Sequence, residues 1–138
     1  MTTTNLQVAE LLIRLFAGVL LIFQGYDKLF RIGITGVIEV FKTDAQNKHI
    51  PVPLISALAW FSSFTEFFGG ILLLTGLCTS YALYALGLDL LLVAIAFTYM
   101  ETMWDMKHVF PRLVLITTLL LFPPEYRTIS LDHFINLK

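Results

Sequence analysis

The sequence predicts an all-α membrane protein, a four-transmembrane-helix bundle with a short amphipathic interfacial helix between helices 1 and 2. The first observation is composition: hydrophobic residues make up 57% of the chain and charged residues only 14%, against about 25% charged residues in soluble domains. The mean hydropathy of +0.80 agrees with this. The second is that the apolar residues form long blocks, and a spanning helix needs about 20 apolar residues in succession. Such blocks should be helical, because lipid cannot satisfy free backbone polar groups.

The blocks divide residues 1–138 into a single integral membrane domain with spans at about 6–30, 54–77, 80–100 and 106–122. Pro51 and Pro53 flank the start of the second span, and the fourth stops where Pro123 and Pro124 cannot continue a helix. The fourth span is the shortest, so we expect it to include part of the Met-Trp-Asp-Met-Lys-His stretch before Val109. The very short link between the second and third spans predicts an antiparallel hairpin.

The connection between the first two spans contains a helical pattern. Ile34, Val37, Ile38 and Phe41 fall at positions i, i+3, i+4 and i+7, which form one apolar stripe. The pattern predicts a short helix on the membrane surface, and a helix outside the membrane that packs on the bundle fits it equally well. Basic residues are concentrated in the first and third connections, and the positive-inside tendency would place both termini outside the cytoplasm.

Among the ionisable residues inside the predicted spans, three stand out: Arg14, Glu66 and Asp89. Each costs several kcal/mol in lipid unless it is paired or solvated. Counted along the helices at about 1.5 Å per residue, the three lie at nearly one depth. Each also shares a helical face with small residues, which mark close helix packing, so we expect all three to point into the bundle. The glycines expected at helix contacts are Gly18, Gly25, Gly69, Gly70 and Gly76.

We therefore expect a buried ion pair between Arg14 and Glu66, with Asp89 within reach. One cation does not balance two carboxylates, so the second one, away from water, would either be protonated at neutral pH or be satisfied by Lys28 (at the polar entrance), water or a ligand. These residues form the candidate ligand site. The alternative is a polar clamp that only fixes the register of the helices.

Several other classes of site are unsupported. The net charge of −1 offers no basic surface for nucleic acid, and a single cysteine excludes an internal disulfide. Glu101, Asp105, His108 and Arg112 would share one helical face, but their loose spacing near water argues against a metal site. No phosphate-binding loop or nucleophile motif is present, so no catalytic residue is assigned.

Two stretches of the sequence carry a family resemblance. The first helix, from Arg-Leu-Phe-Ala-Gly to Gln-Gly-Tyr-Asp-Lys-Leu, and the second, Glu-Phe-Phe-Gly-Gly-Ile-Leu-Leu-Leu-Thr-Gly-Leu, resemble the DoxX-like family of membrane proteins. The Ile-Pro-Val-Pro turn before the second helix also fits, and the resemblance covers about residues 8–100. The matching positions are Arg14, Gly25, Lys28, Glu66, Gly69, Gly70 and Gly76, whereas Asp27 and Asp89 are not assigned to the pattern.

The resemblance implies a four-helix bundle and a range of functions. Relatives include a subunit of a thiosulfate:quinone oxidoreductase, while more distant ones act in membrane-protein assembly. We therefore expect a quinone-associated or accessory subunit of a redox complex in a bacterial inner membrane, with a protein partner or a second copy of the chain. The alternative is an assembly factor or scaffold without small-molecule chemistry. A transporter or proton path is disfavoured, because four short helices leave little room for one.

Overall fold

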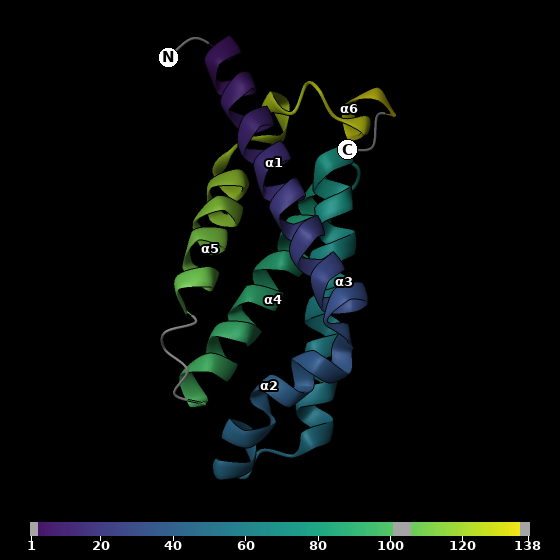
Figure 1. Ribbon diagram of the computed structural model, residues 1–138. Helices are drawn as coiled ribbons and strands as arrows, with labels where there is room; N and C mark the ends of the chain where they lie inside the picture. The colour runs from purple at the N-terminus through teal and green to yellow at the C-terminus, as the bar shows by residue number, and fades with distance from the viewer. Residues whose placement is uncertain (1–2, 101–105, 136–138) are drawn as a thin grey trace.

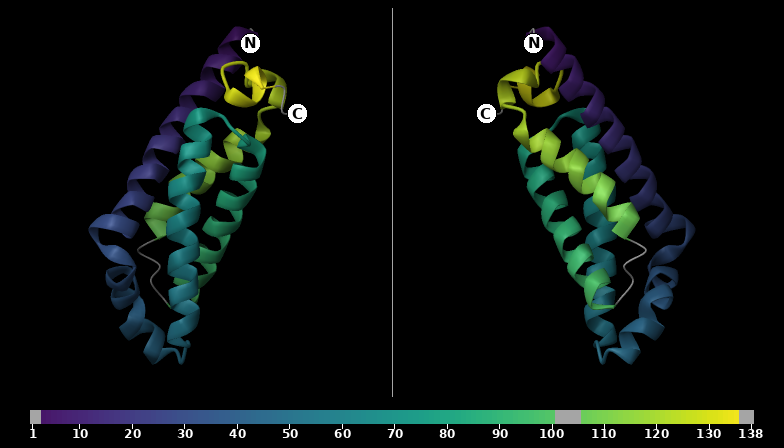
Figure 2. Two further views of the ribbon diagram at one scale, coloured as in Figure 1. Left: turned by 90° about the vertical axis from the view of Figure 1, so that its right-hand side faces the viewer. Right: turned by 90° about the vertical axis from the view of Figure 1, so that its left-hand side faces the viewer.

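The computed structural model describes residues 3–100 and 106–135, and all regular structure in these two ranges is helical. The elements are α1 (Thr3–Tyr26), the π-helical turn η1 (Asp27–Arg31), α2 (Gly33–Asn47), α3 (Val52–Thr75), α4 (Thr79–Tyr99), α5 (Met106–Leu121), the 3-10 turn η3 (Pro124–Tyr126) and α6 (Leu131–Phe134). Helices α1, α3, α4 and α5 form an elongated bundle, with α2 at one end (Figures 1 and 2). The start of α1 and the short α6 lie at the other end (Figure 1).

Three helical stretches within the described ranges are long and apolar enough to cross a membrane: Thr3–Arg31, Val52–Thr75 and Thr79–Tyr99. The predicted fourth span corresponds to α5, which has 16 residues and contains Pro111. At about 1.5 Å per residue it is roughly 24 Å long, short of a hydrocarbon core of about 30 Å. Residues 101–105, which include part of the stretch expected to extend this span, lie outside the described residues.

The outward face of the bundle is apolar. Phe23 on α1, Leu91 on α4 and Phe110 on α5 are more than half exposed. A soluble protein rarely exposes apolar patches of this extent, and helices of this composition are typical of an integral membrane protein. The apolar core lies between the four long helices and is formed by their inward residues, including Leu21, Leu73, Leu86, Leu90 and Ile116.

Glycines bring α1 and α3 into contact at the backbone. A Cβ at Gly25 would lie 2.5 Å from the backbone nitrogen of Phe67, and one at Gly70 would lie 2.8 Å from that of Ile22. Gly18 faces the same contact, since its Cβ would be 3.0 Å from the carbonyl oxygen of Gly70. Close approach of this kind is how membrane helices gain packing energy without a hydrophobic driving force.

A tight turn joins α3 to α4. Gly76 adopts a left-handed conformation (φ +68°), the Leu77 N–H donates to the carbonyl of Leu72, and the Gly76 N–H donates to that of Leu73. This pattern is a Schellman motif, which ends a helix by satisfying its last carbonyls. Earlier in α3, Gly69 faces the side chain of Leu86 and so brings α3 close to α4.

Helix α2 lies against the bundle. Its Ile34 is buried, and Phe41 contacts the ring of Phe97 on α4, with centroids 5.4 Å apart. Phe41, a residue of the predicted apolar stripe, packs against a second, smaller core around Ile55 and Met100. The α-helical part of α1 ends at Tyr26, earlier than the predicted end of the first span, and the π turn that follows leads to Gly33, which also has a positive φ.

Candidate functional site

The buried charges form two separate clusters. The tail cluster comprises Glu10, Arg14, Ser80 and Arg127 and lies at the end of the bundle that holds the C-terminal segment. The central cluster comprises Gln24, Lys28, Ser62, Glu66, Asp89 and Arg112 and lies between the four long helices. The predicted pairing of Arg14 with Glu66 is wrong, because the two residues lie in different clusters.

Arg14 pairs with its own helix rather than with Glu66. Its Nε lies 3.0 Å from Glu10 Oε1, one turn earlier on α1. Its Nη1 donates to the carbonyl of Leu73 at 2.9 Å, and its Nη2 donates to the carbonyl of Ile129. The guanidinium therefore caps the C-terminal end of α3, where a cation is favoured by the helix dipole, and ties the C-terminal segment to it.

The prediction that Arg14, Glu66 and Asp89 lie at nearly one depth was wrong for Arg14, because the start of α1 and the end of α3 do not lie at the same level. The start of α1 projects beyond the α3–α4 turn (Figure 1), so Arg14 is nearer the end of the bundle than residue counting gave. It reaches Leu73, seven residues after Glu66, which is about 10 Å farther along α3.

The rest of the tail cluster fastens the C-terminal segment over the same end. Arg127 donates to Ser80 Oγ at 2.9 Å and lies 4.0 Å from Glu10. Burial lowers the pKa of Arg127, and the charge of Glu10 acts in the opposite direction. The carboxylate of Asp132 accepts the N–H groups of Cys78 and Thr79 at 2.7 and 2.9 Å, which caps the start of α4.

Glu66 on α3 is the centre of the second cluster and is completely buried. Its Oε1 lies 2.5 Å from Nη1 of Arg112, and its Oε2 lies 2.6 Å from Nζ of Lys28. Arg112 Nη1 also donates to Gln24 Oε1 at 2.9 Å, and its Nε donates to the carbonyl of His108 at 2.7 Å. Both oxygens of this carboxylate are thus matched by cations from two other elements.

The local backbone explains how Lys28 reaches Glu66. Lys28 lies in the π turn that follows α1, and the Ile32 N–H donates to the carbonyl of Asp27 at 2.8 Å in the i→i+5 pattern. A π turn adds a residue to the helical turn and changes the direction of the side chains that follow, and such turns are frequent at functional sites. The Lys28 side chain remains 27% exposed, so it joins the buried cluster to the surroundings.

Asp89 on α4 completes the central cluster. Ser62 donates from its hydroxyl to Asp89 Oδ2 at 3.4 Å, and Lys28 Nζ donates to the same hydroxyl at 3.3 Å. Asp89 is 1% exposed, and no hydrogen-bond partner for its Oδ1 is found among the residues that the structure describes. The sequence predicted one cation beside two carboxylates. In the structure, Lys28 and Arg112 are two cations that balance the carboxylates of Glu66 and Asp89.

The pairing roles of Arg112, Glu10 and Arg127 were not predicted from the sequence. Glu10 stands four residues before Arg14, a spacing that favours a pair on one helix. Arg112 was assigned to a polar face with Glu101, Asp105 and His108. In the structure Arg112 is buried and directed to Glu66, while Glu101 and Asp105 lie outside the described residues. Arg112 lies after Val109, inside an apolar block of the sequence, and this position was the available indication that its side chain is buried.

A cavity of about 750 Å³ opens from the central cluster. One end is lined by Lys28, Ser62, Asp89 and Arg112, and the other reaches Lys48 and His49 in the turn between α2 and α3. The wall between these ends is apolar and is formed by residues such as Ile55, Leu58, Leu92, Val93 and Phe97. Its volume is in the range of small-molecule sites, about 300–1,000 Å³. An apolar passage with charged groups at one end suits an amphiphilic ligand.

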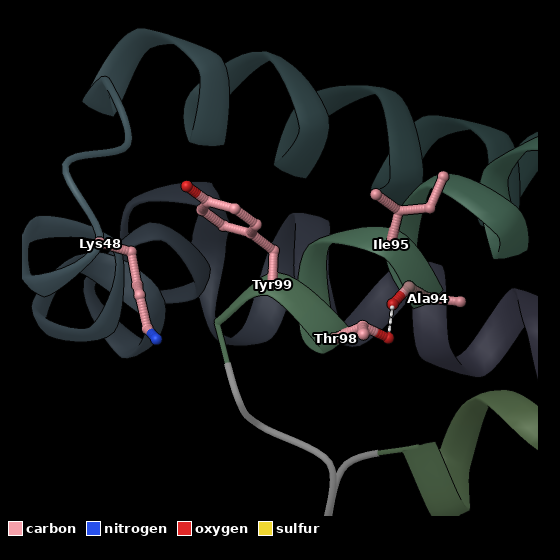
Figure 3. Close-up of a pocket in the computed structure, with 5 residues that line it drawn as sticks. All are labelled: Lys48, Ala94, Ile95, Thr98 and Tyr99. Atoms are coloured by element: carbon pink, nitrogen blue, oxygen red, sulfur yellow. Dashed lines mark hydrogen bonds between the residues drawn. The ribbon is translucent and has the colours of Figure 1, made fainter.

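A second depression of about 610 Å³ lies beside the last turn of α4. Figure 3 shows Thr98, whose hydroxyl donates to the carbonyl of Ala94 at 2.8 Å, and Tyr99 near Lys48. Lys48, Ile95 and Tyr99 also line the larger cavity. The described lining of this depression includes no member of the central cluster, and its shared residues place the depression next to the larger cavity.

No group of three potential metal ligands occurs in residues 3–100 and 106–135. Searches of curated proteins and of solved structures found no match to the chain. The family model of DoxX matches residues 9–100, which is more than half of the sequence and includes most of α1, all of α2, α3 and α4, and most of the central cluster. The chain is therefore an integral membrane protein that belongs to the DoxX family.

Proposed function

We propose that the protein is a quinone-associated or accessory subunit of a membrane redox complex and that the central cavity holds the quinone. The observation that carries the proposal is the cavity itself, an apolar passage between helices that ends at Lys28 and Arg112. A quinone has an apolar ring and tail and two carbonyl oxygens that accept hydrogen bonds. The passage can take the tail, and the two cations at its end can donate to a carbonyl.

The proposal includes a placement in the membrane. We infer that α5 serves as the fourth span, because it exposes Phe110 and Val114 on the outward face of the bundle. We also infer that α2 lies at the membrane surface, since it packs through Phe41 and exposes Val40 on another side. The membrane would be a bacterial inner membrane, with both termini outside the cytoplasm. Lipid surrounds the bundle, and a redox protein or a second copy of this chain would be the partner.

A scaffold or assembly factor is the second candidate function. The observation that favours it is the pairing of both Glu66 oxygens, at 2.5 and 2.6 Å. A carboxylate held by two cations from different helices fixes their register, as a polar residue in a buried seam can. In that case the cavity would be filled by lipid, and the partner would be a protein client.

The test is native mass spectrometry of the protein extracted gently from its own membrane, with quinone analysis of the lipid extract. Leu58→Trp would narrow the cavity, and Leu91→Trp, on the exposed face of α4, is the matched control. A stoichiometric quinone or flavoprotein partner that is lost in Leu58→Trp and retained in Leu91→Trp supports the redox function. A bare bundle, or one that carries only a non-redox client, would replace it with the scaffold function.

A further inference from the structure

One oxygen of Asp89 is the unused acceptor of the cavity. Asp89 lines the cavity and is 1% exposed, and its Oδ2 accepts from Ser62 at 3.4 Å. Within the described ranges, its Oδ1 has no partner. A buried acceptor without a partner loses about 1–3 kcal/mol relative to one that is paired, so a ligand that donates a hydrogen bond here removes that penalty.

The charges of the cluster balance when Asp89 is ionised. Glu66 is paired with both Lys28 and Arg112, so these three groups together carry one net positive charge. The Asp89 carboxylate brings the four groups to neutrality, and an ionised carboxylate can only accept hydrogen bonds. His108, which also lines the cavity, engages Arg112 through its backbone carbonyl.

We propose that Asp89 is the residue that selects the head group of the ligand, and that it selects a hydroxyl over a carbonyl or an ether. A hydroxyl can donate to Asp89 Oδ1 and at the same time accept from Lys28, which also lines the cavity. A carbonyl can accept from Lys28 but leaves Asp89 unpaired. The inference rests on the proposed ligand cavity, and it predicts that the cavity prefers the dihydroxy, reduced form of a quinone.

The experiment uses a pair of probes that have no redox chemistry. Para-decylphenol and para-decylanisole differ only in the hydroxyl and the methyl ether. Their binding to the protein in nanodiscs is measured against empty nanodiscs, which corrects for partition into lipid. Hydrogen bonds to charged groups correspond to roughly tenfold or more in affinity, so we expect the phenol to bind at least tenfold more tightly than the anisole.

Variants then attribute the preference to Asp89. Asp89→Leu removes the acceptor and should bring the ratio of the two affinities close to one. Asp89→Asn keeps the shape and a neutral acceptor, so it should lower the ratio several-fold, and it provides the test if the leucine variant does not fold. Asp27→Asn is the matched control, because Asp27 is paired with Arg31 near the surface and does not line the cavity; its ratio should equal that of the wild type.

Equal affinities for phenol and anisole, a ratio that Asp89→Asn leaves unchanged, or no binding of either probe would each overturn the inference. These outcomes are separate from the fate of the redox function. Phenol selectivity that depends on Asp89, in a protein that copurifies with no quinone, would uphold the site and reject the quinone. A copurifying quinone with equal probe affinities would support the quinone and reject the role of Asp89 in selecting the head group.

Discussion

Arg112 offers the sharpest test of the central cluster. Its side chain is 8% exposed, and its Nη1 lies 2.5 Å from the fully buried Glu66. Arg112→Met keeps most of the apolar stem but removes this contact and the hydrogen bonds to Gln24 and to the carbonyl of His108. Removing one member of a buried ion pair destabilises a protein by about 3–5 kcal/mol. Because Lys28 still lies 2.6 Å from Glu66, we expect a loss of about 3 kcal/mol, at the lower end of that range.

The charge count makes the double variant informative. The wild-type cluster holds two cations (Lys28 and Arg112) and two carboxylates (Glu66 and Asp89), a sum of zero. Arg112→Met gives −1 and Glu66→Gln gives +1, whereas the double variant returns to zero. Groups in one ion-pair network couple by about 0.5–3 kcal/mol. We therefore expect the double variant to lose about 2 kcal/mol less than the sum of the single losses.

The free energy of unfolding is measured by SDS titration in mixed micelles, with far-UV circular dichroism as the signal. Arg31→Met is the control, since Arg31 is 76% exposed and 3.7 Å from Asp27, and surface pairs of this kind contribute about 0–1 kcal/mol. Strict additivity of Arg112→Met and Glu66→Gln, or an equal loss from Arg31→Met, would refute the reasoning that the central charges act as one network.

Three further predictions concern helix contacts. Gly25→Ala places a Cβ 2.5 Å from the backbone of Phe67 and should lower the free energy of unfolding by about 1–3 kcal/mol. In the control Gly87→Ala, the new Cβ meets only a side-chain atom at 4.0 Å, so the free energy of unfolding should change little. The opposite ranking would show that α1 and α3 are farther apart. Asp132→Ala removes the cap of α4 and should cost about 1 kcal/mol in the same titration, and Asp132→Asn, which keeps an acceptor, should cost less, so equal losses would count against the cap. Arg14→Met should release the segment after α5 and speed its cleavage in limited proteolysis, and unchanged cleavage would remove the fastening role.

Much of the fold follows from the sequence by physical necessity. Apolar blocks of spanning length must be helical in lipid. Gly76, which was expected at a helix contact, instead ends α3 with a positive φ. Periodicity also identified the inward faces, because Arg14, Glu66 and Asp89 are all buried. The family followed from the order and spacing of residues in the first two spans. These properties depend on single helices, whose geometry is fixed by 3.6 residues per turn.

The tertiary structure alone decided which charges meet. Pairing depends on how far one helix is shifted along another, and the sequence periodicity of each helix contains no information about that shift. Arg14 therefore joined Glu10 and the end of α3, while Arg112 from the last long helix took the place beside Glu66. The π turn that directs Lys28 inward and the cavity beside Asp89 likewise arise from packing between elements. Residue types and their faces were local properties, whereas the site is a product of the relative positions of four helices.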